Sequence, residues 1–219
     1  GVKITYLEQS KPRGLPDAFI LGEKFIGNKN VAMILGDNFF YGQGLSENLK
    51  RCVKIKSGAK VLLHRVSNPG LFGVAKVNNK NKILKIIEKP KKNISKLAIT
   101  GLYFFDKNVV KYSKTLKPSR RGELEIVDLL NIYKKKNKLT ADFIGRGGAW
   151  LDTGSIDDYY KTFSFVHSIE NRQGVKIACL EEIALFNKWI NKSQIKKQIK
   201  FYGNCDYSNY LKKIIKHGL

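Results

Sequence analysis

The stretch Val31-Ala-Met-Ile-Leu-Gly-Asp-Asn38 decides the fold of this chain. Its apolar and β-branched residues predict a buried strand, and the run ends abruptly in Gly36, Asp37 and Asn38. Ligands of open α/β sheets collect at the carboxyl ends of strands, so the pattern places a carboxylate at a ligand-binding edge. Gly-Asp-Asn is also common as an Asx turn that closes a strand. Asp37 therefore has two interpretations, a turn residue or a metal ligand, and the rest of the chain favours the second.

Strand and helix patterns alternate along the chain from this point. Apolar runs predict strands at 31–35, 59–66, 98–105 and 139–144 and a short strand that ends at Asp152, and amphipathic spacing predicts helices at 14–25, 45–57, 108–116 and 123–136. This alternation predicts an α/β fold with a mostly parallel, doubly wound central sheet.

Two features modify this plan. The turn-rich cluster Asn78-Asn-Lys-Asn81 lies between strand-like runs at 72–77 and 82–87, which predicts an antiparallel hairpin insertion. From Ile156 onward, helical periods dominate. We therefore expect an α/β core at residues 1–155 and a C-terminal helical region at 156–219 that extends the same domain.

Composition bounds the class of protein. The chain has 219 residues, 42% of them hydrophobic, and 41 basic against 18 acidic residues, for a formal net charge of +23. No apolar run reaches the roughly 18 residues of a membrane span, and the start has no signal-peptide pattern. The absence of an initial Met hints that the natural N-terminus is missing. No stretch interleaves Arg with aromatic residues, so we interpret the lysines as solvated surface and keep a nucleic-acid-binding module as an alternative.

The cysteines and histidines show no catalytic or zinc-binding spacing. Cys52, Cys179 and Cys205 are widely separated and odd in number. Reduced thiols of a cytoplasmic protein are the economical interpretation.

Four polar clusters follow or end predicted elements, and together they carry the chemistry. They are Gln9-Ser-Lys-Pro-Arg-Gly14, Gly36-Asp37-Asn38, Glu88-Lys89-Pro90-Lys91 and Trp150-Leu-Asp152-Thr-Gly154. Carboxylates can hold Mg²⁺, which neutralises phosphates that must approach each other, and lysine adds a compact positive charge. Taken singly, Asp152 could be a turn residue and Glu88-Lys89 a surface pair. Their conjunction favours transfer of a phosphoryl-type group.

Several motifs make the chain recognisable. They are Tyr6-Leu-Glu-Gln-Ser-Lys-Pro-Arg-Gly-Leu15, Leu35-Gly-Asp-Asn-Phe-Phe-Tyr-Gly42, Phe72-Gly-Val, Glu88-Lys-Pro-Lys, Thr100-Gly-Leu-Tyr-Phe-Phe-Asp106, Lys117-Pro-Ser-Arg-Arg-Gly-Glu-Leu-Glu-Ile126, Trp150-Leu-Asp-Thr-Gly154 and Arg172-Gln-Gly-Val-Lys-Ile-Ala-Cys-Leu-Glu-Glu-Ile-Ala184. Nearly end to end, the chain resembles the glucose-1-phosphate thymidylyltransferases. The resemblance implies a Rossmann-like nucleotidyltransferase fold and a cytoplasmic homotetramer. It also implies formation of dTDP-glucose and pyrophosphate from dTTP and glucose 1-phosphate, on the route to dTDP-rhamnose and extracellular polysaccharide.

The resemblance also implies residue roles. The catalytic residues would be Asp37, Lys89 and Asp152, of which the two aspartates hold Mg²⁺. The remaining substrate contacts would be Gln9 and Gly14 at the thymine, Gly73, Glu88, Ile99 and Tyr103 at the sugar, and Arg121, with Lys89, at the sugar phosphate. A second nucleotide-sugar site near a subunit interface would involve Gly42, Arg146 and Glu182.

The chain departs from the family pattern in two places. The Gly-rich phosphate loop and a second catalytic lysine are not in this sequence, so we expect these 219 residues alone to be inactive and unstable. Pro16-Asp17 stands where the family usually has Ala-Gln, next to the base site. A second enzyme hypothesis keeps the chemistry but changes the base or the sugar, as in a related uridylyl- or cytidylyltransferase.

Overall fold

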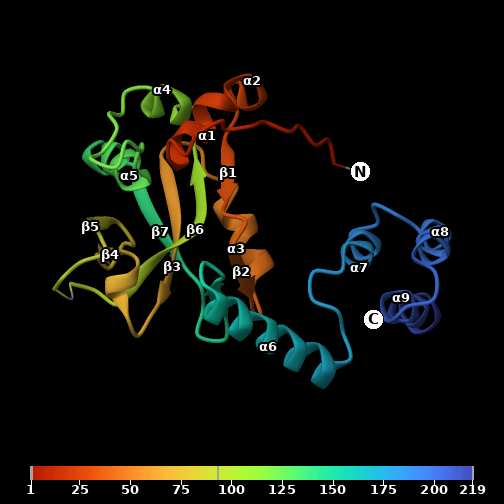
Figure 1. Cartoon of the computed structure of the whole chain (residues 1–219). Coiled ribbons are helices and arrows are strands. Elements are labelled where there is room, and N and C mark those ends of the chain that lie inside the picture. The colour runs from red at the N-terminus through yellow and green to blue at the C-terminus, as the bar shows by residue number, and fades with distance from the viewer. Residues whose placement is uncertain (1, 93, 219) are drawn as a thin grey trace. The chain divides into compact units, whose positions relative to one another are not determined.

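A computed structural model describes residues 2–92 and 94–218. The chain divides into two compact units. Ile4–Ser155 form the larger unit, which is a mixed sheet covered by helices (Figure 1). The smaller unit contains the helical residues from Ile156 onward.

The larger unit is built on one main sheet. Among the described residues it has six strands, in the order β5-β4-β6-β3-β7 with β1 also paired to β6. The bounds are β1 Val31–Ile34, β3 Ala59–Arg65, β4 Gly73–Val77, β5 Ile83–Glu88, β6 Leu97–Phe105 and β7 Leu139–Phe143. The predicted strands and the hairpin are therefore present, and the α/β class is confirmed.

The prediction of a mostly parallel sheet is wrong, because most strand pairs in the described residues are antiparallel. Of the strand pairs in the described part of the chain, β3 with β7 is the parallel one, and β1, β3 and β4 each pair antiparallel with β6. Strands joined without a crossover helix return antiparallel. Between β3 and β6 the chain forms a 3₁₀ turn, Pro69–Leu71, and the β4–β5 hairpin. The long strand β6 therefore runs against its neighbours at the centre of the sheet.

The interpretation of residues 31–35 as a buried strand is also wrong. Burial alternates along β1, and Ile34 is 60% exposed. Within the described chain β1 is paired on one side, by β6. An apolar run does not reveal whether a strand is central or at an edge, which accounts for the error.

Sequence patterns missed one strand. After the turn at Gly36 and Asp37 the chain forms β2, Asn38–Tyr41, which pairs antiparallel with β8, Ala149–Asp152. These two strands form a separate sheet. Its register places Asn38 opposite Asp152.

Helices cover both faces of the main sheet. Side chains of α1 (Leu15–Leu21), α4 (Val109–Ser113) and α5 (Ile126–Lys135) pack in one core with alternate residues of the strands, such as Val61 and Leu63. The intervening residue Leu62 packs in a different cluster, with Cys52 of α3 (Leu45–Cys52). This alternation is the period of two expected of a strand buried on both faces. A further short helix, α2, spans Glu23–Ile26.

The smaller unit has its own core. Its helices are α6 Ile156–Gln173, α7 Leu180–Phe186, α8 Lys192–Tyr202 and α9 Asp206–His217. Cys179, Ile195 and Leu211 are buried together there, and Glu181 accepts hydrogen bonds from Tyr202 and Tyr207. In the part of the chain described, no helix has the length and hydropathy needed to cross a bilayer.

Asp106, which directly follows β6, is a buried carboxylate that links the end of this strand to neighbouring segments. Asp106 is 2% exposed and accepts hydrogen bonds from the backbone N–H of Gly58 and Asn108 and from the hydroxyl of Tyr133. Burial alone would raise its pKa, but these hydrogen bonds outweigh burial and hold the pKa below its ordinary value.

We expect Asp106→Asn to lower the free energy of unfolding by about 1–3 kcal/mol at neutral pH, because an amide cannot satisfy all three donors. A depressed carboxyl pKa gives stability that is present above the ordinary pKa and is lost as pH falls through the lowered value. Denaturant unfolding at neutral and acidic pH checks this. A difference between the two proteins that does not shrink on acidification would contradict the explanation.

Candidate active site

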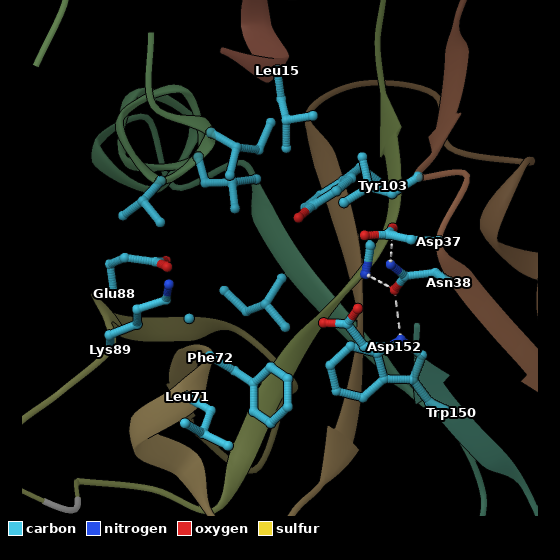
Figure 2. Close-up of a pocket in the computed structure, with 17 residues that line it drawn as sticks. Leu15, Asp37, Asn38, Leu71, Phe72, Glu88, Lys89, Tyr103, Trp150 and Asp152 are labelled. Atoms are coloured by element: carbon cyan, nitrogen blue, oxygen red, sulfur yellow. Dashed lines mark hydrogen bonds between the residues drawn. The ribbon is translucent and has the colours of Figure 1, made fainter. Parts of the chain in front are cut away.

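A cavity of about 250 Å³ opens where several strand ends meet in the larger unit. Figure 2 shows its lining, which combines apolar walls with polar groups. The polar and glycine members are Asp37, Asn38, Gly73, Glu88, Lys89, Gly101, Tyr103 and Asp152, and the apolar members include Leu15, Leu71, Phe72, Ile99 and Trp150. Seven predicted site residues thus line one cavity.

Two carboxylates face one side of this cavity (Figure 2). Asp37 lies in the turn before β2, and Asp152 ends β8. The β2–β8 pairing holds them close, and Thr153 fastens the turn because its backbone N–H and hydroxyl both donate to the carbonyl oxygen of Asp37, at 2.8 and 2.9 Å. The backbone N–H of Gly154 donates to Asp152 Oδ1 at 2.9 Å.

This donor set suits a hard divalent cation. Mg²⁺ is usually bound by one or two carboxylates, with water and substrate phosphates completing the shell. Among the described residues, no group of three or more His, Cys, Asp or Glu side chains is placed to hold a metal ion, so a cation bound by this pair would take its other ligands from water or substrate.

A second polar pair lies across the cavity from the two aspartates (Figure 2). Glu88 ends β5 opposite Gly73 of β4, and a Cβ at position 73 would lie 2.8 Å from Glu88 Oε2. Glycine therefore leaves space for this carboxylate. Lys89 follows with a φ of 41° and donates its backbone N–H to the carbonyl of Phe72. A non-glycine residue in the left-handed region is costly and is often found at functional sites.

The cavity wall changes the acidity of Glu88. Desolvation by the surrounding groups raises the pKa of its carboxyl, while the charge of Lys89 lowers it, and the result lies above the ordinary value. The charge of Arg121 acts in the same direction as that of Lys89.

Arg121 does not line the cavity. Its guanidinium forms hydrogen bonds to both carboxylate oxygens of Glu125, at 3.0 and 2.9 Å. Its predicted contact with the sugar phosphate stays a prediction.

The predicted base-contact residues lie in a neighbouring hollow. This hollow, of about 360 Å³, is lined by Leu7, Gln9, Pro12, Gly14, Leu15, Ala18, Leu21 and Glu123. Gly14 has a φ of 92°, and a Cβ there would lie 2.1 Å from the carbonyl oxygen of Leu124, so glycine is required. Leu15 lines both this hollow and the main cavity.

Asp17, which departs from the family pattern, contacts one of the residues that line this hollow. It is 3% exposed, and its Oδ2 accepts from Gln9 Nε2 at 2.7 Å and from Arg13 Nε at 3.2 Å. The buried carboxylate therefore fixes one end of the Gln9 amide.

The residues predicted for a second nucleotide-sugar site are divided. Arg146 lines a hollow of about 720 Å³ with His64 and Arg65, and Gly42 lines a smaller adjacent one. Gly145 and Gly148 belong to both hollows. Glu182 lies in the smaller unit and accepts a hydrogen bond from Tyr210.

Comparison with known proteins identifies the family. Residues 1–169 match the family described as nucleotidyl transferase. The chain belongs to this nucleotidyl transferase family. A glucose-1-phosphate thymidylyltransferase of Neisseria meningitidis is 44% identical over 99% of this chain and 75% of its own length. Another, from Xanthomonas campestris, is 40% identical over 100% of this chain and 74% of its own length. These relatives confirm the resemblance and the enzyme class.

Solved structures agree with this nucleotidyl transferase assignment. A structure named as a glucose-1-phosphate thymidylyltransferase of Bacillus anthracis matches 75% of this chain and 65% of its own, with 42% identity and a TM-score of 0.67. A UDP-glucose pyrophosphorylase structure matches 75% of this chain and 66% of its own, with 24% identity and a TM-score of 0.66, which supports the fold alone.

Sequence reasoning did not assign Asn38, Phe72 or Trp150 to the site. Trp150 is 8% exposed, lines the cavity and packs on Phe72 with ring centroids 5.1 Å apart. Recognition of β2 as a strand paired with β8 would have placed Asn38 beside the site.

We expect Glu88→Gln to stabilise the fold at pH 8. A raised carboxyl pKa means that stability is complete below the ordinary pKa and is lost as pH rises through the raised value. The midpoint of thermal unfolding should therefore be higher for the variant at pH 8 and equal to the parent below pH of about 4.

The matched control is Glu47→Gln, on the exposed part of α3 outside the cavity. An equal gain in both variants would mean that relief of general charge effects, rather than desolvation of Glu88, is responsible.

Proposed function

We propose that this nucleotidyl transferase forms dTDP-glucose from dTTP and glucose 1-phosphate. The observation that carries the proposal is the cavity with two carboxylates on one side and the Glu88–Lys89 pair on the other. Relatives at 40–45% identity named glucose-1-phosphate thymidylyltransferase support the choice of substrates.

The reaction exchanges one P–O bond for another. A phosphate oxygen of glucose 1-phosphate attacks the α-phosphorus of dTTP, the bond from that phosphorus to the bridging oxygen breaks, and pyrophosphate leaves with the electron pair. Mg²⁺ bound by Asp37 and Asp152 would neutralise the phosphates and align the attacking and leaving oxygens. A protein nucleophile is not required, because positioning and electrostatic stabilisation supply the catalysis.

The other side of the cavity would bind the sugar phosphate. We assign Glu88 to accept hydrogen bonds from sugar hydroxyls, while Gly73, Ile99 and Tyr103 shape the wall around the ring. Lys89 would place its ammonium against the sugar phosphate, where a compact charge is effective. Arg121 would join it after leaving Glu125.

The base would enter the hollow of Gln9 and Gly14. Gln9 Nε2 donates to Asp17, whose carboxylate can only accept, so the amide orientation is fixed and Oε1 is presented as an acceptor. Thymine and uracil carry an N3–H donor, whereas N3 of cytosine is an acceptor. This arrangement supports dTTP or UTP over CTP.

Further assignments follow the family. We propose a cytoplasmic homotetramer whose product enters dTDP-rhamnose synthesis and extracellular polysaccharide. That the 219 residues alone lack turnover stays a prediction.

Asp152→Asn should lower Mg²⁺-dependent pyrophosphate release by more than about 100-fold, because even partners outside the coordination shell typically contribute about 10–100-fold. The assay uses dTTP and glucose 1-phosphate with the 219-residue chain and with the longest open reading frame that contains it. Normal turnover of the variant in an active parent would remove Asp152 from the metal site. Failure of every parent with dTTP, UTP and CTP would refute the enzyme assignment.

Asp17→Asn should lower the preference for dTTP over CTP in kcat/KM by about fivefold, the equivalent of about 1 kcal/mol for one ordinary hydrogen bond. The new amide can donate as well as accept, so Gln9 is no longer held in one orientation. Arg13→Gln removes the ion pair but keeps the carboxylate, and it should leave the ratio unchanged. Equal ratios for both variants and the parent would show that Asp17 does not set base choice.

A further inference from the structure

The side chain of Asn38 lies at the meeting point of three elements beside the candidate metal ligands (Figure 2). Its Nδ2 donates to Asp37 Oδ1 at 2.8 Å. Its Oδ1 accepts from the indole Nε1–H of Trp150 at 2.6 Å and from the backbone N–H of Gly101 at 2.9 Å. Asn38 thus connects the turn before β2 with β8 and with the middle of β6.

These partners allow one orientation of the amide. Both groups that contact Oδ1 are pure donors, and the carboxylate that contacts Nδ2 is a pure acceptor. A flipped amide would turn its NH₂ toward two N–H groups and its oxygen toward a carboxylate. An aspartate at position 38 could not donate to Asp37 and would place a like charge beside it. Asparagine is therefore matched to all three contacts.

The surroundings are shaped to hold this side chain. A Cβ at position 101 would lie 2.6 Å from the Cγ and Oδ1 of Asn38, so only glycine lets the amide approach β6. Trp150 is itself fixed by Phe72 and lies 6.3 Å from the ring of His64, edge-on. The indole donor is therefore held in place by aromatic packing.

We propose that Asn38 is a positioning residue that holds Asp37 for cation binding. By engaging Oδ1, the amide fixes the carboxylate plane, and Oδ2 has no hydrogen-bond partner in the described part of the chain. Hydrogen bonds from outside the coordination shell orient carboxylate ligands in this way. The inference rests on the proposed metal-dependent function, since it needs a cation at Asp37 and Asp152.

The test measures cation binding directly, without turnover. Mn²⁺ is titrated into the 219-residue chain by isothermal calorimetry, with the parent, Asn38→Ala, Asn38→Asp and Trp150→Phe. We expect Asn38→Ala to weaken Mn²⁺ binding by about 10–100-fold. Trp150→Phe should give a smaller loss, because the Gly101 donor remains on Oδ1.

A control separates positioning from general destabilisation. Asn48 is another buried amide, 6% exposed, whose Nδ2 donates to the carbonyl of Phe143 at 2.7 Å. Asn48→Ala should lower the thermal midpoint yet leave Mn²⁺ affinity unchanged. Circular dichroism at the titration temperature confirms that each variant is folded.

The outcomes separate the positioning role of Asn38 from the metal site itself. Loss of Mn²⁺ binding in Asp152→Asn together with unchanged affinity in Asn38→Ala would overturn the positioning role and keep the metal site. Equal weakening by Asn38→Ala and Asn48→Ala would also overturn it. Absence of Mn²⁺ binding by the folded parent would overturn the metal site and the positioning role together. A retained affinity in Asn38→Asp would also overturn the positioning role, because this variant cannot donate to Asp37.

Discussion

The pairing of β2 with β8 is the constraint on which the candidate site depends. It joins two segments far apart in the sequence and sets Asn38 opposite Asp152. Both are very short strands, so their own hydrogen bonds give limited stability. The Thr153 contacts to Asp37 and the Trp150 contact to Asn38 reinforce the pairing. The same contacts that hold the strands together therefore also fix the two carboxylates.

The central strand β6 provides the rigid support for this small sheet. Tyr103 and Phe105 face the core with α1 and α5, while Leu102 and Phe104 face the cluster that contains Leu62. Because both faces are packed, β6 cannot shift register without exposing its apolar residues. Gly101 lies in the middle of this strand. Because it has no side chain, the amide of Asn38 can approach the backbone of β6, where the N–H of Gly101 donates to it. The packing of both faces fixes the register of β6. This strand therefore supports the β2–β8 pairing, which is weak by itself.

The sequence predicted the α/β class, the hairpin and most strands, because each has a clear apolar period or turn cluster. It did not predict how β6 pairs, since direction depends on whether a helix connects two strands rather than on their composition. β2 was missed because Asn38 reads as a turn residue and the strand has only four residues. Motif matches named Asp37, Glu88 and Asp152, but side-chain networks such as those of Asn38 and Asp17 depend on contacts across the fold that no local pattern encodes.

The two sides of the cavity place opposite demands on their carboxylates. A cation site needs carboxylate oxygens within reach, and the side chain of Asp37 is exposed and accepts a hydrogen bond from Asn38. At the sugar side an ionised carboxylate would repel an incoming phosphate, and there desolvation raises the pKa of Glu88. Lys89 follows directly and restores positive charge where the phosphate would lie, at the cost of a left-handed backbone. Glu88 and Lys89, which are adjacent in the chain, therefore supply a hydrogen-bond acceptor for hydroxyl groups and a positive charge for the phosphate of the same substrate.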